Sequence, residues 1–350
     1  MKCCQETKLD LVLDRRVGDS LTRRSLLRGA ATAAGAAVAT RATGVRAQQP
    51  VRLAFCSQLL CVVPYEVTRA RGFFLEQGVD VELVYTRGGN AAMQALVGGA
   101  VDYAATSFDV AVQAFANNAP IRRFATTGRL PLFALAVGPQ RVDDITEFRD
   151  LQGRTVGVSG LGNADHTILL YLLAEAGLDA GRVEFATLGP NLYDALRVGH
   201  VDAGMVQEPA LTLLVEAGGS VLFNAMDIEH ADRYLGGAYE FMGVAVLAEE
   251  RDQRLEEMRA IARALEQGLA YQREAPVEEL RAALPAELLV GGEGERFDEI
   301  ILRYRDSLYP ESVAIDVSAA ERVVNALKMS GTLTQDVDLG VLLDIEVVPG

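Results

Sequence analysis

The chain has 350 residues, half of them hydrophobic, and a formal net charge of −15. This length is ample for a large core and favours two lobes over one. The negative net charge disfavours nucleic acid and anionic membranes as partners, because both repel a negative surface. We therefore expect no nucleic-acid partner and no stable membrane contact.

The N-terminal segment is typical of an export signal. A weakly hydrophobic, alanine-rich run over residues 26–39 follows Arg23 and Arg24, and residues 45–47 place small side chains where a signal peptidase cuts. The run is too short to span a bilayer and lacks the polar face of a surface helix. The arginine pair predicts the twin-arginine pathway. We expect a soluble periplasmic protein after cleavage near Ala47, with 24 basic and 44 acidic residues.

Strand and helix patterns alternate from residue 51 onward. The expected elements are a strand over 51–57, a helix over 64–77, a strand over 79–86, a helix over 91–98 and a strand over 101–107. Gly78 and Gly99 follow the two helices, as glycines that end helices do. Residues 131–139 come next and form a short hydrophobic strand pattern.

The same order of elements then returns. The second copy has a strand over 155–159, a helix over 166–176, a strand over 183–188, a helix over 192–198 and a strand over 201–207. Its phrase ALRVGHVDAG (195–204) matches ALVGGAVDYA (95–104) at five positions, including Asp102 and Asp202. We interpret the two aspartates as structural residues in the turns that enter the third strands.

Two copies of β-α-β-α-β predict two similar α/β lobes, each with a doubly wound, mostly parallel sheet. The expected domains are the export signal (1–47), a first lobe (51–130 plus 248–350) and a second lobe (131–247). The hydrophobic strands over 131–139 and 241–250 are the expected crossings, and two crossings form a hinge around a cleft. Helices follow over 253–272 and onward to about residue 328.

Four cysteines are present, and Cys3 and Cys4 lie upstream of the export signal. Cys56 and Cys61 remain, and we favour two buried thiols over a disulfide, because so short a loop strains the bond. No cysteine or histidine spacing fits a metal site.

Ligands of open parallel sheets bind beyond the carboxyl ends of the strands. In both predicted lobes those ends are polar or glycine, and several precede helices whose free N–H groups favour anions. The competing interpretation is that such residues are only caps and turns. The candidate ligand-binding residues are Ser57, Gln58, Gly89, Asn90, Thr106, Ser107, Ser159, Gly160, Asn163, His166 and Glu208.

The stretch 159–166 and Glu208 also have alternative interpretations. The stretch SGLGNADH (159–166) is similar to a dinucleotide fingerprint, but its third position is Asp165, which would repel a pyrophosphate, so we expect no nicotinamide and no other cofactor. Asn163 or Asp165 also suits a helix cap. Glu208 has two interpretations of equal weight. Its carboxylate accepts a hydrogen bond from the ligand, or it caps the helix that follows. No catalytic serine elbow, phosphate loop or HExxH motif is present.

Several stretches together resemble one family. GFFLEQGVDVELV, GGNAAMQALVGGAVDYAATS, LQGRTVGVSGLG, LLAEAGLDAGRVEF and VDAGMVQEPA are similar to the nitrate/sulfonate/taurine-type solute-binding proteins of bacterial ABC importers, which include binders of thiamine-pyrimidine precursors. The resemblance runs from about residue 51 to 247. It implies the two-lobe periplasmic binding protein fold (type II), a small-molecule ligand, and docking on an ABC permease with its ATPase. We expect a monomer that is not an enzyme.

The resemblance also implies where the ligand is held: Ser57-Gln58, Thr106-Ser107 and residues 159–166. The alternative function is a pyrimidine-precursor binder or a pyrimidine-synthase-like enzyme on the same fold, but the cysteine-rich signature of those synthases is absent. The family often has an aromatic residue before the Glu-Pro pair, where this chain has Gln207.

The ligand's charge follows from the polar groups of the cleft. Hydroxyls and helix N-termini suit an oxyanion, whereas Asp109, Asp165 and Glu208 would repel a bare anion if they face the cleft. Both sets are satisfied by a small organic acid, a sulfonate or carboxylate, that also carries an amine, hydroxyl or ring N–H.

Overall fold

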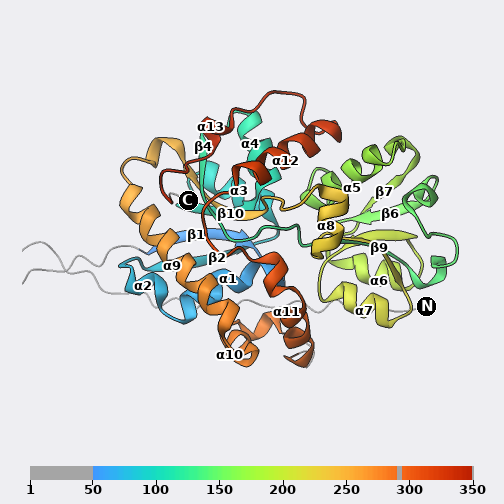
Figure 1. Cartoon of the computed structure of the whole chain (residues 1–350), viewed down its shortest axis with the longest axis horizontal. Helices are drawn as coiled ribbons and strands as arrows, with labels where there is room; N and C mark the ends of the chain where they lie inside the picture. Colours follow the sequence, from blue (N-terminus) through green and yellow to red (C-terminus); the bar gives the residue numbers. More distant parts are fainter. Residues whose placement is uncertain (1–49, 290–293, 349–350) are drawn as a thin grey trace, which may run out of the picture. The chain divides into compact units, whose positions relative to one another are not determined.

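The computed structural model describes residues 50–289 and 294–348. The predicted export signal and the cleavage site near Ala47 lie outside the described residues. The described strands form two separate five-stranded sheets with helices on both faces (Figure 1). The strands are β1 (Val51–Cys56), β2 (Val81–Thr86), β3 (Tyr103–Ser107), β4 (Ile121–Thr126), β5 (Ala134–Val137), β6 (Thr155–Val158), β7 (Glu184–Thr187), β8 (Ala203–Val206), β9 (Ser220–Asn224) and β10 (Met242–Leu247).

The two sheets have the same plan. Their strand orders are β2-β1-β3-β10-β4 and β7-β6-β8-β5-β9. Strands β1 and β6, the second strands in these orders, pair parallel with both neighbours, whereas β10 and β5 are antiparallel to theirs. Four of the five strands in each sheet therefore run in one direction. This arrangement confirms the predicted α/β class with mostly parallel sheets.

One expected boundary needs correction. Residues 242–247 were assigned to the second lobe, but β10 lies in the first sheet between β3 and β4. All six of its residues are buried, because it is an interior strand covered on both faces. The chain therefore returns to the first lobe between β9 and β10. The sequence patterns also missed β4 and β9, which are the outer strands beside β10 and β5.

Helices fill the connections and the C-terminal third. They are α1 (Leu59–Ala70), α2 (Phe73–Glu76), α3 (Gly89–Val97), α4 (Phe108–Ala116), α5 (Ala164–Glu175), α6 (Leu192–Arg197), α7 (Ala210–Glu216), α8 (Ile228–Leu235), α9 (Leu255–Glu274), α10 (Val277–Ala282), α11 (Gly294–Leu308), α12 (Val317–Met329) and α13 (Leu339–Leu342). None of the helices in the described part of the chain is both long and apolar enough to cross a membrane.

Helix α1 begins five residues before its predicted start at Pro64. Proline lacks an N–H, so the carbonyl of Leu60 receives no helical hydrogen bond from position 64. The Tyr309 hydroxyl, from the far end of the chain, donates to that carbonyl at 2.9 Å instead. A left-handed residue, Gly72 with φ of 82°, then separates α1 from α2 inside the predicted helix.

The two aspartates of the repeated phrase make the same hydrogen bonds in each lobe. Asp102 Oδ2 accepts from the Arg52 N–H at 2.8 Å, and Asp202 Oδ2 accepts from the Thr155 N–H at 2.9 Å. In return, the N–H of each aspartate donates to the carbonyl of the same partner, at 2.9 Å in both lobes. Each aspartate thus ties the start of the third strand to the start of the first, as a structural residue and not as a ligand contact.

We expect Asp202→Ala to lower the free energy of unfolding by about 1.5–3 kcal/mol, the usual range for a hydrogen bond to a charged group. The variant also loses the ion pair with Arg141, whose Nε lies 2.6 Å from Asp202 Oδ1. Urea unfolding measures the effect. Asp194→Ala is the control, because that side chain is 74% exposed. Equal stability of the two variants would contradict the structural role of Asp202.

Two segments cross between the lobes and lie side by side. Residues 127–133 lead into β5, and residues 225–241 return from β9. The Phe241 N–H donates to the Gly128 carbonyl, the Tyr239 N–H to the Arg129 carbonyl, and the Ala225 N–H to the Phe133 carbonyl, at 2.9–3.0 Å. The two crossings therefore form a paired ribbon rather than independent linkers.

The C-terminal helices contact both lobes, whereas the sequence analysis placed them in the first lobe alone. Helix α12 packs against α4 of the first lobe and α5 of the second (Figure 1). The side chains of Cys56 and Cys61 in the first lobe are free buried thiols, as expected.

Candidate functional site

The carboxyl ends of the parallel strands in both lobes meet between the sheets. The Asn90 amide, at the start of α3 in the first lobe, donates to Asn163 Oδ1, before α5 in the second lobe, at 2.6 Å. This hydrogen bond joins two of the predicted site residues across the cleft. The lobes are therefore in direct contact at the cleft rim.

A small network extends from this bridge into the second lobe. Asn163 Nδ2 donates to the Ser159 hydroxyl at 3.0 Å, and that hydroxyl donates to Asp165 Oδ1 at 2.7 Å. The Ser159 N–H donates to the other Asp165 oxygen at 2.6 Å. Gly160 leaves room in this turn, since a Cβ there would lie 2.8 Å from the Asn163 amide. Asn163 occupies the N-cap position of α5, but its side chain makes no capping hydrogen bond.

Three predicted residues gather at one corner of the first lobe. Gly89 starts α3 close to the end of β3, where a Cβ would lie 3.6 Å from the Thr106 Cβ and 3.8 Å from the Ser107 hydroxyl. Thr106 and Ser107 are both buried, and the Thr106 hydroxyl donates back to the Ser107 carbonyl at 3.1 Å. Ser107 holds the N-cap position of α4 without a side-chain capping bond.

Asp109, in the first turn of α4, is the most unusual group at this corner. It is 2% exposed, and neither carboxylate oxygen has a hydrogen-bond partner among the described residues. Burial, with a smaller contribution from the negative charge of Asp165, raises the pKa of Asp109 to about 6, although the Ser107 hydroxyl and Arg123 act in the opposite direction. An ionisable group held in this way is typical of a functional site.

Tyr239 brings a third element to the same place. It lies on the returning crossing segment and is 1% exposed, and its hydroxyl also has no partner among the described residues. Burial raises the pKa of the Tyr239 hydroxyl well above its usual value, with contributions from Asp109 and from Tyr171 on α5. Asp109 interacts electrostatically with both Asp165 and Tyr239, and we call these three residues the acidic cluster.

The nearby cation, Arg123, already has an ion-pair partner. Arg123 is fully buried on β4, and its Nη2 lies 3.0 Å from Glu240 Oε1. The same guanidinium donates to the carbonyls of Thr106 and Phe241 at 2.9 and 2.8 Å. The ion pair balances Glu240, so the two carboxylates of the acidic cluster keep a net negative charge when ionised.

Two candidates from the first strand-helix turn remain separate from this cluster. The Ser57 hydroxyl donates to the Thr86 carbonyl within its own lobe at 2.8 Å. Gln58 is exposed at the N-cap position of α1, and its carbonyl, not its side chain, accepts from the N–H groups of Cys61 and Val62. Both therefore fit the cap-and-turn interpretation in this conformation.

His166 and Glu208 also have structural partners. The Gly162 N–H donates to His166 Nδ1 at 3.1 Å, the ring packs edge-on against Phe185 with centroids 4.8 Å apart, and burial lowers its pKa. Glu208 accepts from the N–H and the hydroxyl of Thr212, both at 3.1 Å. Glu208 thus caps the start of α7, and burial raises its pKa.

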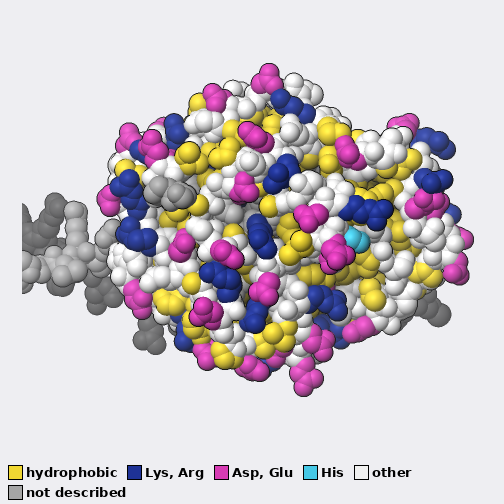
Figure 2. Space-filling model, in the orientation of Figure 1, with side chains coloured by type: hydrophobic (Ala, Val, Ile, Leu, Met, Phe, Trp, Pro, Cys, Tyr) yellow, Lys and Arg dark blue, Asp and Glu magenta, His cyan; other side chains and the backbone are white. Residues whose placement is uncertain are grey.

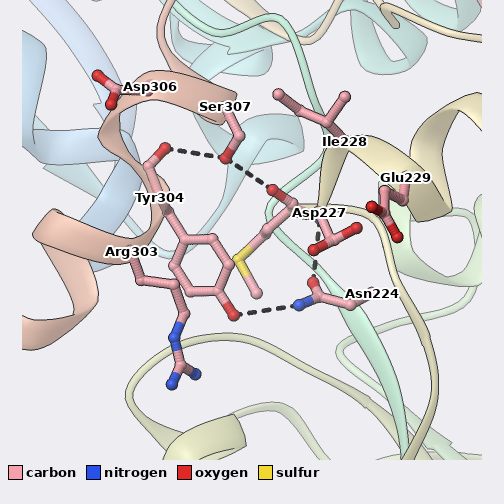
Figure 3. A pocket seen from close by; sticks show the side chains of 9 residues that line it. Asn224, Asp227, Ile228, Glu229, Arg303, Tyr304, Asp306 and Ser307 are labelled. Atoms are coloured by element: carbon pink, nitrogen blue, oxygen red, sulfur yellow. Dashed lines mark hydrogen bonds between the residues drawn. The ribbon is translucent and has the colours of Figure 1, made fainter.

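A pocket of about 490 Å³ lies beside the crossing segments and not at the predicted cleft residues. Figure 3 shows how α11 is fastened there: Asn224 Nδ2 lies 3.1 Å from the Tyr304 hydroxyl, and the Ser307 hydroxyl donates to the Met226 carbonyl at 2.7 Å. These bonds explain how the C-terminal helices reach the second lobe. None of the eleven predicted site residues lines this pocket.

Acidic and basic side chains are interspersed over the face in Figure 2, without a patch of one sign. Within residues 50–289 and 294–348, no group of three or more His, Cys, Asp or Glu side chains is arranged to hold a metal ion.

Sequence reasoning placed its candidate residues at the carboxyl ends of the strands but did not choose the members of the acidic cluster. Asp109 and Asp165 were weighed as charges and not chosen as site residues. A lone carboxylate in the apolar run FDVAV, directly after a buried strand, was the available signal for Asp109. Tyr239 lies in an irregular segment with no pattern that marks it.

The architecture of two α/β lobes with mixed five-stranded sheets is that of the periplasmic binding proteins. A Candida albicans protein described as having the generic periplasmic binding protein fold is 17% identical, with a TM-score of 0.67 over 85% of this chain and 97% of the other. The aliphatic sulphonate-binding protein SsuA from Escherichia coli is 17% identical, with a TM-score of 0.63 over 84% and 97%. The nitrate-binding protein NrtA from Synechocystis PCC 6803 is 15% identical, with a TM-score of 0.67 over 85% and 86%.

The sequence gives the family directly. Residues 62–279 match the NMT1/THI5-like family, and the chain belongs to it. No curated protein sequence matches the chain. The family and the fold both agree with the solute-binding proteins that the sequence motifs resemble.

Proposed function

We propose that this protein is the extracytoplasmic solute-binding component of an ABC importer. It captures a small organic acid between its two lobes and delivers it to a membrane permease that is driven by an ATPase. It acts in the periplasm as a monomer, after export by the twin-arginine pathway and cleavage near Ala47. It uses no cofactor and catalyses no reaction.

The observation that carries this proposal is the meeting of polar side chains from the two lobes, where Asn90 and Asn163 form a direct hydrogen bond. Asp109 and Tyr239 have buried polar atoms without hydrogen-bond partners among the described residues. A ribbon of two crossing segments connects the lobes, which suits opening and closing by a hinge.

The substrate class follows from the surrounding groups. Buried hydroxyls and the N-terminus of α4 offer donors to an acidic group, whereas Asp109 and Asp165 favour a separate donor on the ligand. A sulfonate or carboxylate with a second, nitrogen-bearing end meets both requirements. The sulphonate-binding and nitrate-binding proteins of the same fold support an anionic group on the ligand.

The experiment is a binding screen of the mature protein against small sulfonates, carboxylates and nitrate, first by thermal shift and then by calorimetry. A solute that binds only the folded state raises the unfolding temperature. Small-angle scattering with a saturating hit should show a smaller radius of gyration, because the lobes close on the solute. No binding by any of these acids would contradict the proposed function, and an unchanged or larger radius with a hit would contradict closure by a hinge.

Asn163→Ala tests whether the predicted cleft holds the solute. It removes the bridge to Asn90 and the bond to Ser159, so we expect the affinity for a hit to fall about 3- to 30-fold, for one or two neutral hydrogen bonds. Asn117→Ala is the matched control, because Asn117 is exposed at the opposite end of α4 from the cleft. If both variants bind the hit with equal affinity, the solute is not held at Asn163.

A further inference from the structure

We infer that α11 is a clasp that holds the two lobes in contact and sets how readily the ligand-free protein opens. The clasp consists of Arg296, Tyr304 and Ser307 on α11, together with Arg129 on the first crossing segment. This inference rests on the hinge of the proposed function, but it concerns the protein before any solute binds. None of the four residues is a predicted cleft residue, so the clasp acts on solute affinity through the position of the lobes.

Helix α11 is fixed to the first lobe. The Arg305 guanidinium donates to the Ala275 carbonyl at the end of α9 at 3.2 Å, and α9 packs against α1 and α2. Directly after α11, the buried Tyr309 hydroxyl donates to the Leu60 carbonyl of α1 at 2.9 Å. These contacts indicate that α11 moves with the first lobe.

The end of α11 also binds both crossing segments. The last carbonyls of a helix have no donor within the helix, and Arg129 of the first segment supplies donors here. Its N–H donates to the Leu308 carbonyl at 2.8 Å, and its side chain donates to the carbonyls of Ser307 and Asp306 at 3.0 and 2.6 Å. On the returning segment, the Met226 carbonyl accepts from the Ser307 hydroxyl at 2.7 Å. The hinge ribbon is therefore fastened to α11 by both of its segments.

Two further bonds of α11 reach the second lobe itself. Asn224 Nδ2, at the end of β9, donates to the Tyr304 hydroxyl at 3.1 Å (Figure 3). The Asn224 Oδ1 atom accepts from the Met226 N–H at 3.0 Å, which fixes the amide group in this orientation. Near the other end of α11, Arg296 Nη1 lies 2.9 Å from Glu216 Oε1 on α7. A helix of the first lobe thus makes polar bonds to two separate elements of the second.

The contact between α11 and the second lobe is not a packed core. The pocket of about 490 Å³ lies there, and Asn224, Tyr304 and Ser307 line it together with the exposed side chains of Asp227 and Glu229. A packed core resists deformation, whereas a hydrogen bond beside water exchanges for one to water at a small net cost. A few polar bonds beside a pocket therefore form a contact that can break when the lobes part.

The conformation in which the clasp is formed is also the one in which the lobes touch. The bond between Asn90 and Asn163 joins the lobes across the cleft in the same structure. When the lobes part, β9 and α7 move with the second lobe while α11 stays with the first, so the bonds of Tyr304 and Arg296 break. Bonds made in only one of two conformations shift the equilibrium toward that conformation. The clasp therefore favours the contacting form, and its loss favours the open form.

Spin labels on the two lobes measure this equilibrium directly. Asn117→Cys, exposed after α4, and Asp194→Cys, 74% exposed on α6, carry the labels. Electron–electron double resonance then gives the distances between the labels in the mature protein without solute. The native thiols of Cys56 and Cys61 are buried, and a chain without the added cysteines gives the background labelling.

Tyr304→Phe removes only the hydroxyl to which Asn224 donates. We expect the ratio of open to contacting molecules to rise about two- to tenfold, as for one neutral hydrogen bond. Adding Arg296→Gln should raise the ratio by a further factor of about 1.5 to 5, as for a partly exposed ion pair. Tyr271→Phe is the matched control and should leave the distances unchanged, because its hydroxyl donates to Glu279 within the first lobe.

A change of fold is detected separately. Urea unfolding of each variant should remain a single cooperative transition with the slope of the parent protein. The open population then comes from intact molecules. Distances that stay unchanged in the double variant, or that become shorter, would overturn the inference and leave the contacts of α11 as purely structural.

The outcomes also separate the clasp from the proposed function. The measurement needs no solute, so longer distances in the variants support the clasp even if the acid screen gives no hit. If an acid does bind, its affinity should fall in the double variant in proportion to the lost contacting population. A hit that binds all variants equally, with unchanged distances, would leave the solute-binding function standing and reject the clasp.

Discussion

Arg123→Met is expected to lower the free energy of unfolding by about 3–5 kcal/mol, the cost of leaving a buried charge without its partner. Arg123 is fully buried, and its removal leaves the Glu240 carboxylate, 1% exposed, without a countercharge. The carbonyls of Thr106 and Phe241 lose their donors as well. Gly243 leaves the space that this guanidinium occupies, since a Cβ there would clash with it.

Chemical denaturation measures this effect, and two companion variants interpret it. Arg122→Met removes the same charge at the next position of β4, on the opposite face of the strand, and should change the stability little. Arg123→Met combined with Glu240→Leu removes both charges, so it should recover part of the loss. A double variant less stable than Arg123→Met alone would show that the ion pair is not the main cause.

Asp109→Asn is expected to stabilise the ligand-free protein at neutral pH, by up to about 3 kcal/mol. The estimate follows from the ordinary carboxyl pKa of 3.8 and the value of about 6 in the fold. Between these values the folded state binds more protons than the unfolded state, so the free energy of unfolding falls as pH rises. The penalty is absent below about pH 3.8 and complete above about pH 6.

The measurement is urea unfolding of dialysed protein between pH 4 and pH 8. The stability difference between Asp109→Asn and the wild type should be small at pH 4 and should grow until about pH 6. The charged groups that act on Asp109 are Asp165 and Arg123. Asp143→Asn, at an exposed position, should show no such growth. A variant that is less stable than the wild type at pH 7 would contradict the burial cost of Asp109.

These two predictions act in opposite directions at one site. Arg123 holds β4, the end of β3 and the crossing segment together. Asp109, which interacts with it electrostatically, is expected to reduce the stability of the ligand-free protein. Activity and stability often conflict at functional sites, so a buried group that costs stability is consistent with a binding function.

Local patterns were sufficient for the repeated β-α-β-α-β order, the family and the polar edges of the sheets. Strand and helix periodicity and glycine stops depend on neighbouring residues only, so the sequence by itself determined them. The repeat of Asp102 and Asp202 was visible for the same reason, and its structural interpretation is confirmed by the matched hydrogen bonds to Arg52 and Thr155.

The start of α1, the place of β10 and the acidic cluster depended on residues far apart in the chain. Tyr309 satisfies the Leu60 carbonyl that Pro64 leaves open, across 249 positions, and no local pattern encodes that bond. Strand β10 follows the second copy but pairs in the first sheet, because its six buried residues need cover on both faces. Asp109 and Tyr239, which lie on α4 and on a crossing segment, are buried without hydrogen-bond partners among the described residues. Tertiary structure alone decides such contacts, since burial is a property of the assembled fold.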